Sequence, residues 1–312
     1  MRAFLFPGQG SQAVGMGAAL AGASRTARDV FEQVDEALGQ NLFRLMREGP
    51  EDELKLTENA QPAIMAHALA VFRALSRDGG IELTTAAQFV AGHSLGEYSA
   101  LCAAGSFDLS TTAKLLKLRG QAMQAAVPVG VGAMAALLGA DLELAQKIAD
   151  AAAQGEVCAV ANDNDPGQVV LSGHKGAIDR AIEMAKDMGA KRAVPLPVSA
   201  PFHCPLMQPA AEAMRDALSY VVVEEPAVPI YANVIAAPVT DPDAIRSLLV
   251  DQVTGMVRWR ETIAEMSAAG VGEFVELGGK VLGGMVKRTA PDAKVTSVVT
   301  IEDVEALAKE IG

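Results

Sequence analysis

Residues 90–98 are Val-Ala-Gly-His-Ser-Leu-Gly-Glu-Tyr, a Gly-x-Ser-x-Gly motif between an apolar strand-like segment and a helix-like one. A serine at such a strand-to-helix turn is the nucleophile elbow of α/β-hydrolase-like sheets. The glycines allow the sharp turn that exposes the hydroxyl, and the N-terminus of the helix stabilises a developing oxyanion. The alternative is a glycine-rich turn whose serine only caps the helix. The context on both sides favours the elbow, so we predict that Ser94 is a nucleophile.

Strand-like and helix-like segments alternate on both sides of this motif, which favours a mostly parallel sheet covered by helices. The expected strands are 86–91, 228–232, 273–277 and 295–299, and the expected helices are 62–77, 95–104, 111–124, 205–219, 244–252 and 259–268, with one more helix after 277 and one at the C-terminus.

A block in the middle of the chain has a different order of elements. It is expected to contain strands at 132–138, 157–161, 168–172 and 192–196, helices at 141–153 and 176–188, and a turn at 162–167. The order β-α-β-β-α-β is that of a ferredoxin-like unit. We therefore predict an α/β protein with an α/β-hydrolase-like large catalytic subdomain, residues 1–127 and 198–312, and an inserted ferredoxin-like small subdomain, residues 128–197. A cleft between the two is where a ligand site is expected.

The composition excludes several classes of protein. The 312 residues include 26 basic and 38 acidic ones, a formal charge of −12, and a nucleic-acid binder would need a basic face. No apolar segment reaches the ~20 residues of a membrane span. The three cysteines, Cys102, Cys158 and Cys204, are odd in number and widely spaced, which predicts neither a disulfide framework nor a zinc site. A reduced, cytoplasmic protein is expected.

A nucleophilic serine needs a base, and the chain has four histidines. His203 lies in a proline-bracketed segment, 198–205, at the second boundary of the inserted block, and it follows the serine in the chain as in hydrolase-type folds. His93 adjoins Ser94 at a tight turn and is expected to play a supporting role. His67 falls in an apolar helical pattern as a core residue, and His174 follows a turn as a capping or surface residue. We predict His203 as the base.

The helix predicted at 111–124 has one misplaced charge. Its apolar residues fall on one side, and at 100° per residue Arg119 lies in the middle of that stripe. Burying a guanidinium without a partner lowers the stability of the fold by roughly several kcal/mol. Arg119 must therefore meet either an internal acid or a carboxylate of a ligand, for which the arginine fork is well suited. The helical pattern alone leaves these two possibilities open.

The N-terminal stretch Phe6-Pro7-Gly8-Gln9-Gly10-Ser11-Gln12 follows a strand-like run and superficially matches a dinucleotide-binding fingerprint. That motif needs a helix directly at the turn, and Gly15 and Gly17 would interrupt it. A nucleotide site is therefore disfavoured. The alternative is a loop that presents backbone N–H groups to whatever it faces.

These motifs together resemble the malonyl-CoA:acyl carrier protein transacylase family of bacterial fatty-acid synthesis. The resemblance extends over essentially the whole chain and rests on the inserted block and on several motifs, namely 6–12, 92–98, Arg119, Pro201-Phe202-His203, Gln61-Pro62-Ala63, 168–173 and 279–282. It implies transfer of malonyl from malonyl-CoA to the 4′-phosphopantetheine thiol of acyl carrier protein through a serine ester.

The resemblance also implies a role for each matching residue. Ser94 would carry the malonyl group, and His203 would act first as general base and then as general acid. The backbone N–H groups of Gln9 and Leu95 would form the oxyanion hole, so the N-terminal loop would present its backbone to the acyl oxygen. Arg119 would bind the free carboxylate of malonyl.

Further residues would surround these. Phe202 would be a wall against branched malonyl groups, with a packing aromatic as the alternative. Gln61 and His93 would support the site from behind. Family members often orient the histidine with a main-chain carbonyl of an asparagine before Pro-Val-Arg-Trp, and this chain has Gly255-Met256-Val257-Arg258-Trp259 there. The orienting carbonyl would then belong to Gly255.

The expected partners follow from the same resemblance. Malonyl-CoA enters as a thioester substrate, and neither a cofactor nor a metal is expected. Because both the chain and a carrier protein are acidic, docking would need a local basic strip, for which Lys175, Lys191 and Arg192 are candidates. A monomer is expected. Two rivals remain: a serine esterase or thioesterase, which would want an acidic third triad member, and a non-catalytic acyl-binding or carrier-docking module.

Overall fold

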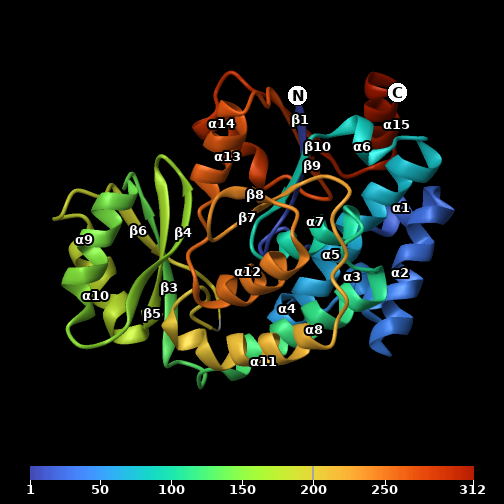
Figure 1. Cartoon of the computed structure of the whole chain (residues 1–312). Helices are drawn as coiled ribbons and strands as arrows, with labels where there is room; N and C mark the ends of the chain where they lie inside the picture. Colours follow the sequence, from blue (N-terminus) through green and yellow to red (C-terminus); the bar gives the residue numbers. More distant parts are fainter. Residues whose placement is uncertain (199) are drawn as a thin grey trace.

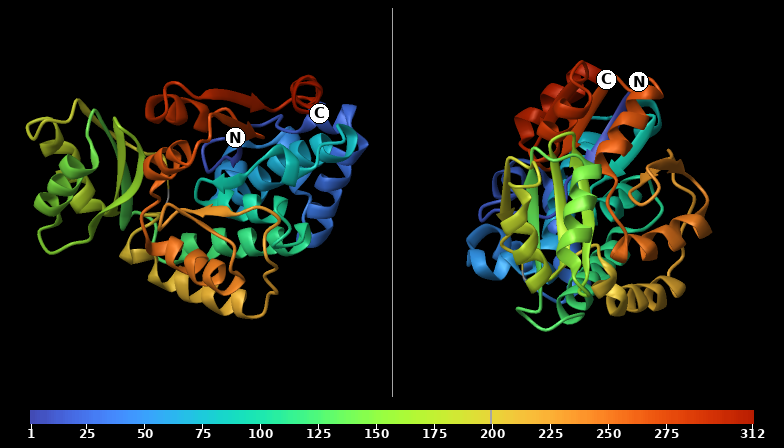
Figure 2. Two further views of the ribbon diagram at one scale, coloured as in Figure 1. Left: turned by 45° about the horizontal axis from the view of Figure 1, so that its top comes forward. Right: turned by 90° about the vertical axis from the view of Figure 1, so that its left-hand side faces the viewer.

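The computed structural model describes residues 1–198 and 200–312. It has a large part built around a six-stranded sheet and a smaller part built around a four-stranded sheet, which stand beside each other in Figures 1 and 2. Strands β3 to β6 of the smaller sheet all fall between residues 132 and 195. The exact boundaries 127/128 and 197/198 remain a prediction.

The large sheet has the strand order β10-β9-β1-β2-β7-β8. All of its neighbours pair in parallel except β7 and β8, which form an antiparallel pair. Its strands are β1 (Arg2–Phe6), β2 (Phe89–Gly92), β7 (Ile230–Ala232), β8 (Ala237–Val239), β9 (Glu273–Leu277) and β10 (Lys294–Val298).

Helices cover both faces of this sheet, and other helices of the large part pack on the outside of that layer. Before the inserted part they are α1 (Ala18–Ala23), α2 (Arg25–Leu38), α3 (Leu42–Glu48), α4 (Glu51–Lys55), α5 (Thr57–Arg73), the π turn η1 (Ala74–Asp78), α6 (Leu83–Ala86), α7 (Leu95–Ala103) and α8 (Leu109–Ala125). After it come the 3-10 turn η2 (Pro205–Met207), α11 (Gln208–Ser219), α12 (Pro242–Thr254), α13 (Trp259–Ala268), α14 (Leu282–Thr289) and α15 (Ile301–Ile311).

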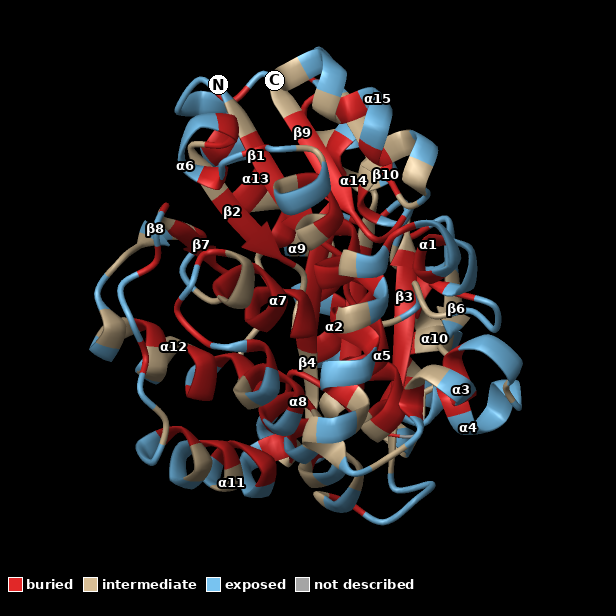
Figure 3. Cartoon of the chain, turned by 90° about the vertical axis from the view of Figure 1, so that its right-hand side faces the viewer, coloured by how far each residue is buried: buried red, intermediate tan, exposed pale blue. Residues whose placement is uncertain are grey.

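Strand β1 shows why its sequence is an unbroken apolar run. Phe4 and Phe6 point into the core formed with α2, α5 and α7, whereas Ala3 and Leu5 pack on the opposite face with Trp259 of α13 and neighbouring residues of α14. A parallel strand buried on both faces needs apolar residues at every position. Figure 3 shows β1 and β9 almost wholly buried, with exposed residues on the outer sides of the covering helices.

The small part is an antiparallel sheet in the order β4-β5-β3-β6 with two helices on one face. Its elements are β3 (Gly132–Leu138), α9 (Leu142–Ala153), β4 (Cys158–Asp165), β5 (Gln168–His174), α10 (Lys175–Ala185) and β6 (Arg192–Pro195). This is the ferredoxin-like β-α-β-β-α-β arrangement. The mixed α/β fold with one mostly parallel and one antiparallel sheet is therefore confirmed.

The predicted turn at 162–167 is wrong. Strand β4 continues through the polar residues Asn162 to Asp165, and only Pro166 and Gly167 turn the chain. The polar run is buried because it packs against the large part: Asp163 forms an ion pair with Arg260 and Asp165 with Arg288. Polar residues indicated a solvent-exposed turn, but tertiary ion pairs make them an interface strand.

Helix α5 also differs from the prediction. It begins at Thr57, five residues before Pro62, where the predicted helix starts. Pro62 instead lies in the second turn of a helix that is buried along most of its length. Most other predicted elements agree with the structure to within a few residues.

Candidate active site

The turn between β2 and α7 holds Ser94 in a strained conformation. Its φ is 53° and its ψ is −112°, a region that non-glycine residues rarely adopt outside functional sites. The turn is pressed against the N-terminal loop, because a Cβ added to Gly96 would lie 2.2 Å from the Phe6 carbonyl oxygen. Glycine is thus required at position 96, and the predicted elbow geometry is present.

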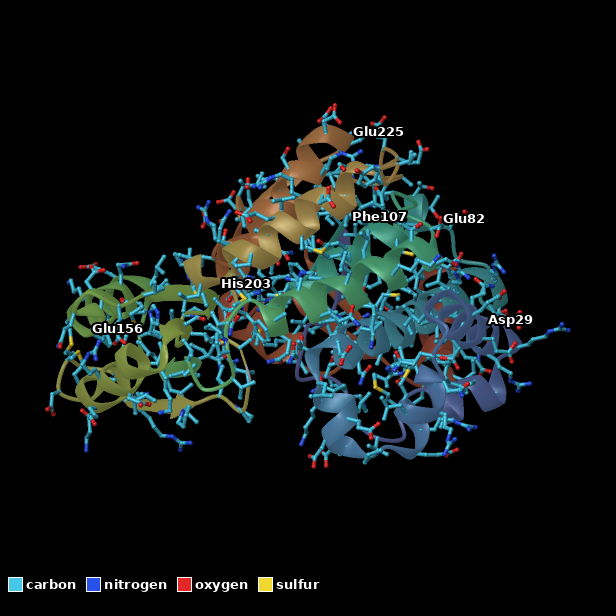
Figure 4. All side chains as sticks on the ribbon, turned by 90° about the horizontal axis from the view of Figure 1, so that it is seen from below. Asp29, Glu82, Phe107, Glu156, His203 and Glu225 are labelled. Carbon is cyan, nitrogen blue, oxygen red and sulfur yellow. The ribbon has the colours of Figure 1, made fainter. Side chains whose placement is uncertain are left out.

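His203 lies next to Ser94. The Ser94 Oγ to His203 Nε2 distance is 2.8 Å, and the segment before η2 brings the histidine to the junction of the two parts (Figure 4). The other ring nitrogen, Nδ1, is 2.8 Å from the carbonyl oxygen of Gln252. Because a carbonyl can only accept, Nδ1 carries the proton and Nε2 is free to accept one from the serine.

The prediction that the Gly255 carbonyl orients His203 is wrong. Gln252 makes the hydrogen bond, while the Gly255 backbone has a smaller effect in the same direction on the pKa of His203. Both residues lie at the C-terminal end of α12, where carbonyl groups lack helical partners. Only the fold can decide which of these free carbonyls the imidazole meets.

The pKa of His203 is lowered to about 3, first by burial and second by the positive charge of Arg119. The imidazole is therefore neutral at physiological pH, the form that can remove a proton from the serine hydroxyl. Any change that reduces the effective charge of Arg119 makes His203 a stronger base.

Arg119 is 1% exposed, as its place in the apolar stripe predicts. Its Nη1 donates to Gln61 Oε1 at 2.8 Å, and its Nη2 donates to Gln252 Oε1 at 2.9 Å and to Ser94 Oγ at 3.2 Å. Among the described residues Arg119 forms no ion pair, and its Nε is buried without a partner. A buried guanidinium held only by neutral acceptors keeps its charge available for an anion beside the serine.

The N-terminal loop reaches the same place. A Cβ on Gly8 would lie 2.7 Å from the His93 carbonyl oxygen, so the loop lies directly on the elbow. Gln9 and Leu95 both line the cavity above Ser94. The side chain of Gln9 is tied down by Thr57, whose Oγ1 donates to Gln9 Oε1 at 3.1 Å.

The cavity holding these groups has a volume of about 330 Å³ and is formed by both parts of the chain. Its polar lining includes Ser94, His203 and Arg119. Its apolar lining includes Phe202, which is 8% exposed, together with Met134, Val170, Leu196 and Val198.

Residues 3–301 match the acyl transferase domain family. The chain belongs to this family. It is 43% identical over 310 residues, 99% of both chains, to malonyl CoA-acyl carrier protein transacylase of Escherichia coli (strain K12). The structure of acyl-carrier-protein-S-malonyltransferase from Bartonella henselae superposes with a TM-score of 0.97 at 53% identity, covering 100% of this chain and 99% of that one.

A further solved structure is a type II PKS acyl-carrier protein in complex with its malonyl-transacylase. It has a TM-score of 0.95 and 39% identity, with 99% of each chain covered. The resemblance inferred from the motifs is therefore confirmed at the level of the family.

In this acyl transferase His93 does not contact the serine hydroxyl. Its Nε2 is 2.8 Å from Asn164 Oδ1 on β4, and its ring lies edge-on to Trp259 at 5.4 Å. It therefore connects the elbow to the inserted sheet. Gln61 supports Arg119 directly, as expected of a residue behind the site.

Three residues at the centre of the site were missed by the sequence analysis. Asn233 accepts from the Ser94 backbone N–H at 2.8 Å, and Gln252 touches His203, Arg119 and Ser94. Glu97, inside the quoted motif, accepts hydrogen bonds from both of them. Asn233 and Gln252 act through amide and backbone groups, and no spacing in the sequence distinguishes them. Only Glu97 could have been predicted, because it is an acidic residue in the first turn of an apolar helix.

The three basic residues expected to form one strip are all exposed but lie apart. Lys175 is at the Val131 end of β3 and pairs with Asp179, whereas Lys191 and Arg192 are at the Leu138 end. At about 3.3 Å per residue the length of β3 separates them by roughly 20 Å. The three residues therefore form two separate basic sites, and their role in carrier-protein docking stays a prediction.

Among residues 1–198 and 200–312 of this acyl transferase, no group of three or more histidine, cysteine or acidic residues is arranged to hold a metal ion. No helix within 1–198 or 200–312 combines the length and apolarity of a membrane span.

Proposed function

We propose that this acyl transferase moves a malonyl group from malonyl-CoA to the phosphopantetheine thiol of acyl carrier protein through an ester on Ser94. One observation supports this most strongly: Ser94 Oγ lies 2.8 Å from a neutral imidazole and 3.2 Å from a buried guanidinium. The first pair is that of a serine nucleophile. The second selects an acyl group with a free negative end.

In the first half-reaction His203 Nε2 accepts the proton of Ser94 Oγ, and the oxygen attacks the thioester carbonyl. The negative charge moves to the carbonyl oxygen, which the backbone N–H groups of Gln9 and Leu95 stabilise. When the intermediate collapses, the C–S bond breaks and the proton on His203 passes to the sulfur of CoA. The products are malonyl-Ser94 and free CoA.

The second half-reaction is the reverse with another thiol. The phosphopantetheine thiol gives its proton to His203 and attacks the ester carbonyl. Collapse breaks the C–O bond, and the proton returns from His203 to Ser94 Oγ. No redox step occurs, so the proposal needs no cofactor or metal beyond the thioester substrate.

Arg119 has two effects in this scheme. Its fork binds the malonyl carboxylate and fixes the acyl group beside Ser94. The carboxylate also offsets the guanidinium charge, one of the causes of the lowered pKa of His203. Binding of the correct substrate therefore makes the base stronger just before it is needed.

The remaining assignments are extensions of the same proposal. Phe202 beside His203 limits substituents on the malonyl group. A monomer suffices, because both walls of the cavity come from one chain. A cytoplasmic location agrees with three free cysteines. The expected carrier-protein partner is supported by the malonyl-transacylase structure in complex with a carrier protein.

A serine esterase or thioesterase is disfavoured, because His203 meets a carbonyl oxygen rather than a third acidic residue. The deciding experiment loads the enzyme with malonyl-CoA, removes free CoA, and adds either holo-acyl carrier protein or buffer. Malonyl-carrier protein should form within seconds, while the ester persists for much longer in buffer. Rapid hydrolysis without the thiol would favour the esterase instead.

A further inference from the structure

A second ionisable carboxyl lies beneath the serine. Glu97 is one turn along α7 from Ser94 and is 2% exposed. A single oxygen, Oε2, accepts from the Asn233 backbone N–H at 3.0 Å and from Gln252 Nε2 at 2.8 Å. Both donors are neutral, and among the described residues Glu97 forms no ion pair. Buried carboxylates without a cation are rare, so this placement needs an explanation.

Glu97 and Arg119 are separated by one amide group. Gln252 Oε1 accepts from Arg119 Nη2 at 2.9 Å, while Nε2 of the same amide donates to Glu97. Opposite charges at this separation still attract in a water-poor interior. Because the amide lies between them, the carboxyl balances the guanidinium charge without occupying the side that faces Ser94.

We propose that Glu97 is the buried counter-charge of Arg119 before substrate binds and takes up a proton when a malonyl carboxylate binds Arg119. This inference rests on the proposed function. A ligand carboxylate becomes a second anion at the same guanidinium, and two carboxylates near one cation cannot both stay ionised at no cost. One proton from solvent removes that conflict and is released when the acyl group leaves.

The groups around Glu97 make such uptake possible near neutral pH. Burial raises its pKa to about 7, and the positive charge of Arg119 on α8 opposes that rise. Tyr98 on the same helix lies 5.7 Å from the Arg119 guanidinium, and burial keeps it protonated. His203, beyond Gln252, is neutral. Glu97 is therefore the group in this cluster that changes charge at working pH.

The test uses Ser94→Ala protein, which binds the thioester without reacting. Calorimetric titrations with malonyl-CoA and acetyl-CoA at pH 7.5, in buffers of different ionisation enthalpy, give the protons taken up by each. We expect malonyl-CoA to take up about half a proton more than acetyl-CoA. Affinity for malonyl-CoA should weaken by up to about tenfold as pH rises from 7 to 8, with acetyl-CoA unaffected.

The matched variant adds Glu97→Gln. Because one oxygen accepts both hydrogen bonds, the glutamine carbonyl can retain them while the charge is lost. The malonyl-specific uptake and its pH dependence should disappear. The inference is overturned if the malonyl-specific proton uptake is unchanged in this variant, or if Ser94→Ala alone shows no such uptake. If the double variant fails to fold, the measurement on Ser94→Ala alone tests the inference. Equal affinity of the parent for malonyl-CoA and acetyl-CoA would instead contradict the proposed role of Arg119.

Discussion

Replacement of Arg119 by alanine tests how this acyl transferase selects its acyl group. Arg119 is 1% exposed, and its guanidinium donates hydrogen bonds only to neutral acceptors. Without it a malonyl carboxylate would be desolvated beside Ser94 with no cation. Loss of one partner of such a buried pair costs about 2–5 kcal/mol. At 1.36 kcal/mol per tenfold, kcat/KM for malonyl-CoA should fall about 30- to 5,000-fold.

Acetyl-CoA has no distal carboxylate, so its kcat/KM should fall less than about tenfold in the same variant. Removal of the positive charge also relieves one cause of the low pKa of His203, which favours the base. The assay follows CoA release with each thioester. Lys114→Ala, an exposed cation on the same helix, is the control and should leave both rates unchanged. Equal losses for malonyl-CoA and acetyl-CoA in Arg119→Ala would show that Arg119 does not bind the malonyl carboxylate.

Three further changes test other parts of the structure. Arg288→Ala leaves the buried Asp165 without its ion-pair partner. Because Arg288 is half exposed, we expect the free energy of unfolding in urea to fall by about 1–2 kcal/mol, and adding Asp165→Asn should recover part of it. An unchanged urea midpoint would contradict the interface role of β4. Burial lowers the pKa of His67 to about 4, so as the pH falls below 6.5 the unfolded chain binds a proton at this histidine before the folded chain does. The free energy of unfolding should therefore fall by about 3 kcal/mol between pH 7 and pH 4. His67→Gln should make stability depend less steeply on pH, and an equally steep dependence would exclude His67 as its source. Phe202→Ala should raise the methylmalonyl-to-malonyl rate ratio severalfold, whereas a constant ratio would assign Phe202 to packing alone.

The sequence predicted those parts of the fold that local patterns specify. The elbow at Ser94 follows from a glycine motif between a strand and a helix, and the burial of Arg119 from helical periodicity. The ferredoxin-like block was visible as an order of elements. These features depend on spacing and residue type, which are explicit in a single chain.

The errors arose where long-range contacts decide the structure. Asn162 to Asp165 look like a turn until Arg260 and Arg288, about a hundred residues later, supply their partners. The carbonyl that orients His203 belongs to Gln252, and any residue could have supplied it. Backbone groups leave no mark on the sequence, so such roles become visible only in three dimensions.

The whole proposed mechanism depends on formation of a malonyl ester on Ser94. Intact-mass measurement after brief incubation with malonyl-CoA tests it directly, with Ser94→Ala treated identically. The enzyme should gain the mass of one malonyl group and lose it when a carrier-protein thiol is added, and the variant should gain nothing. An unmodified enzyme, or an adduct that persists in Ser94→Ala, would contradict it.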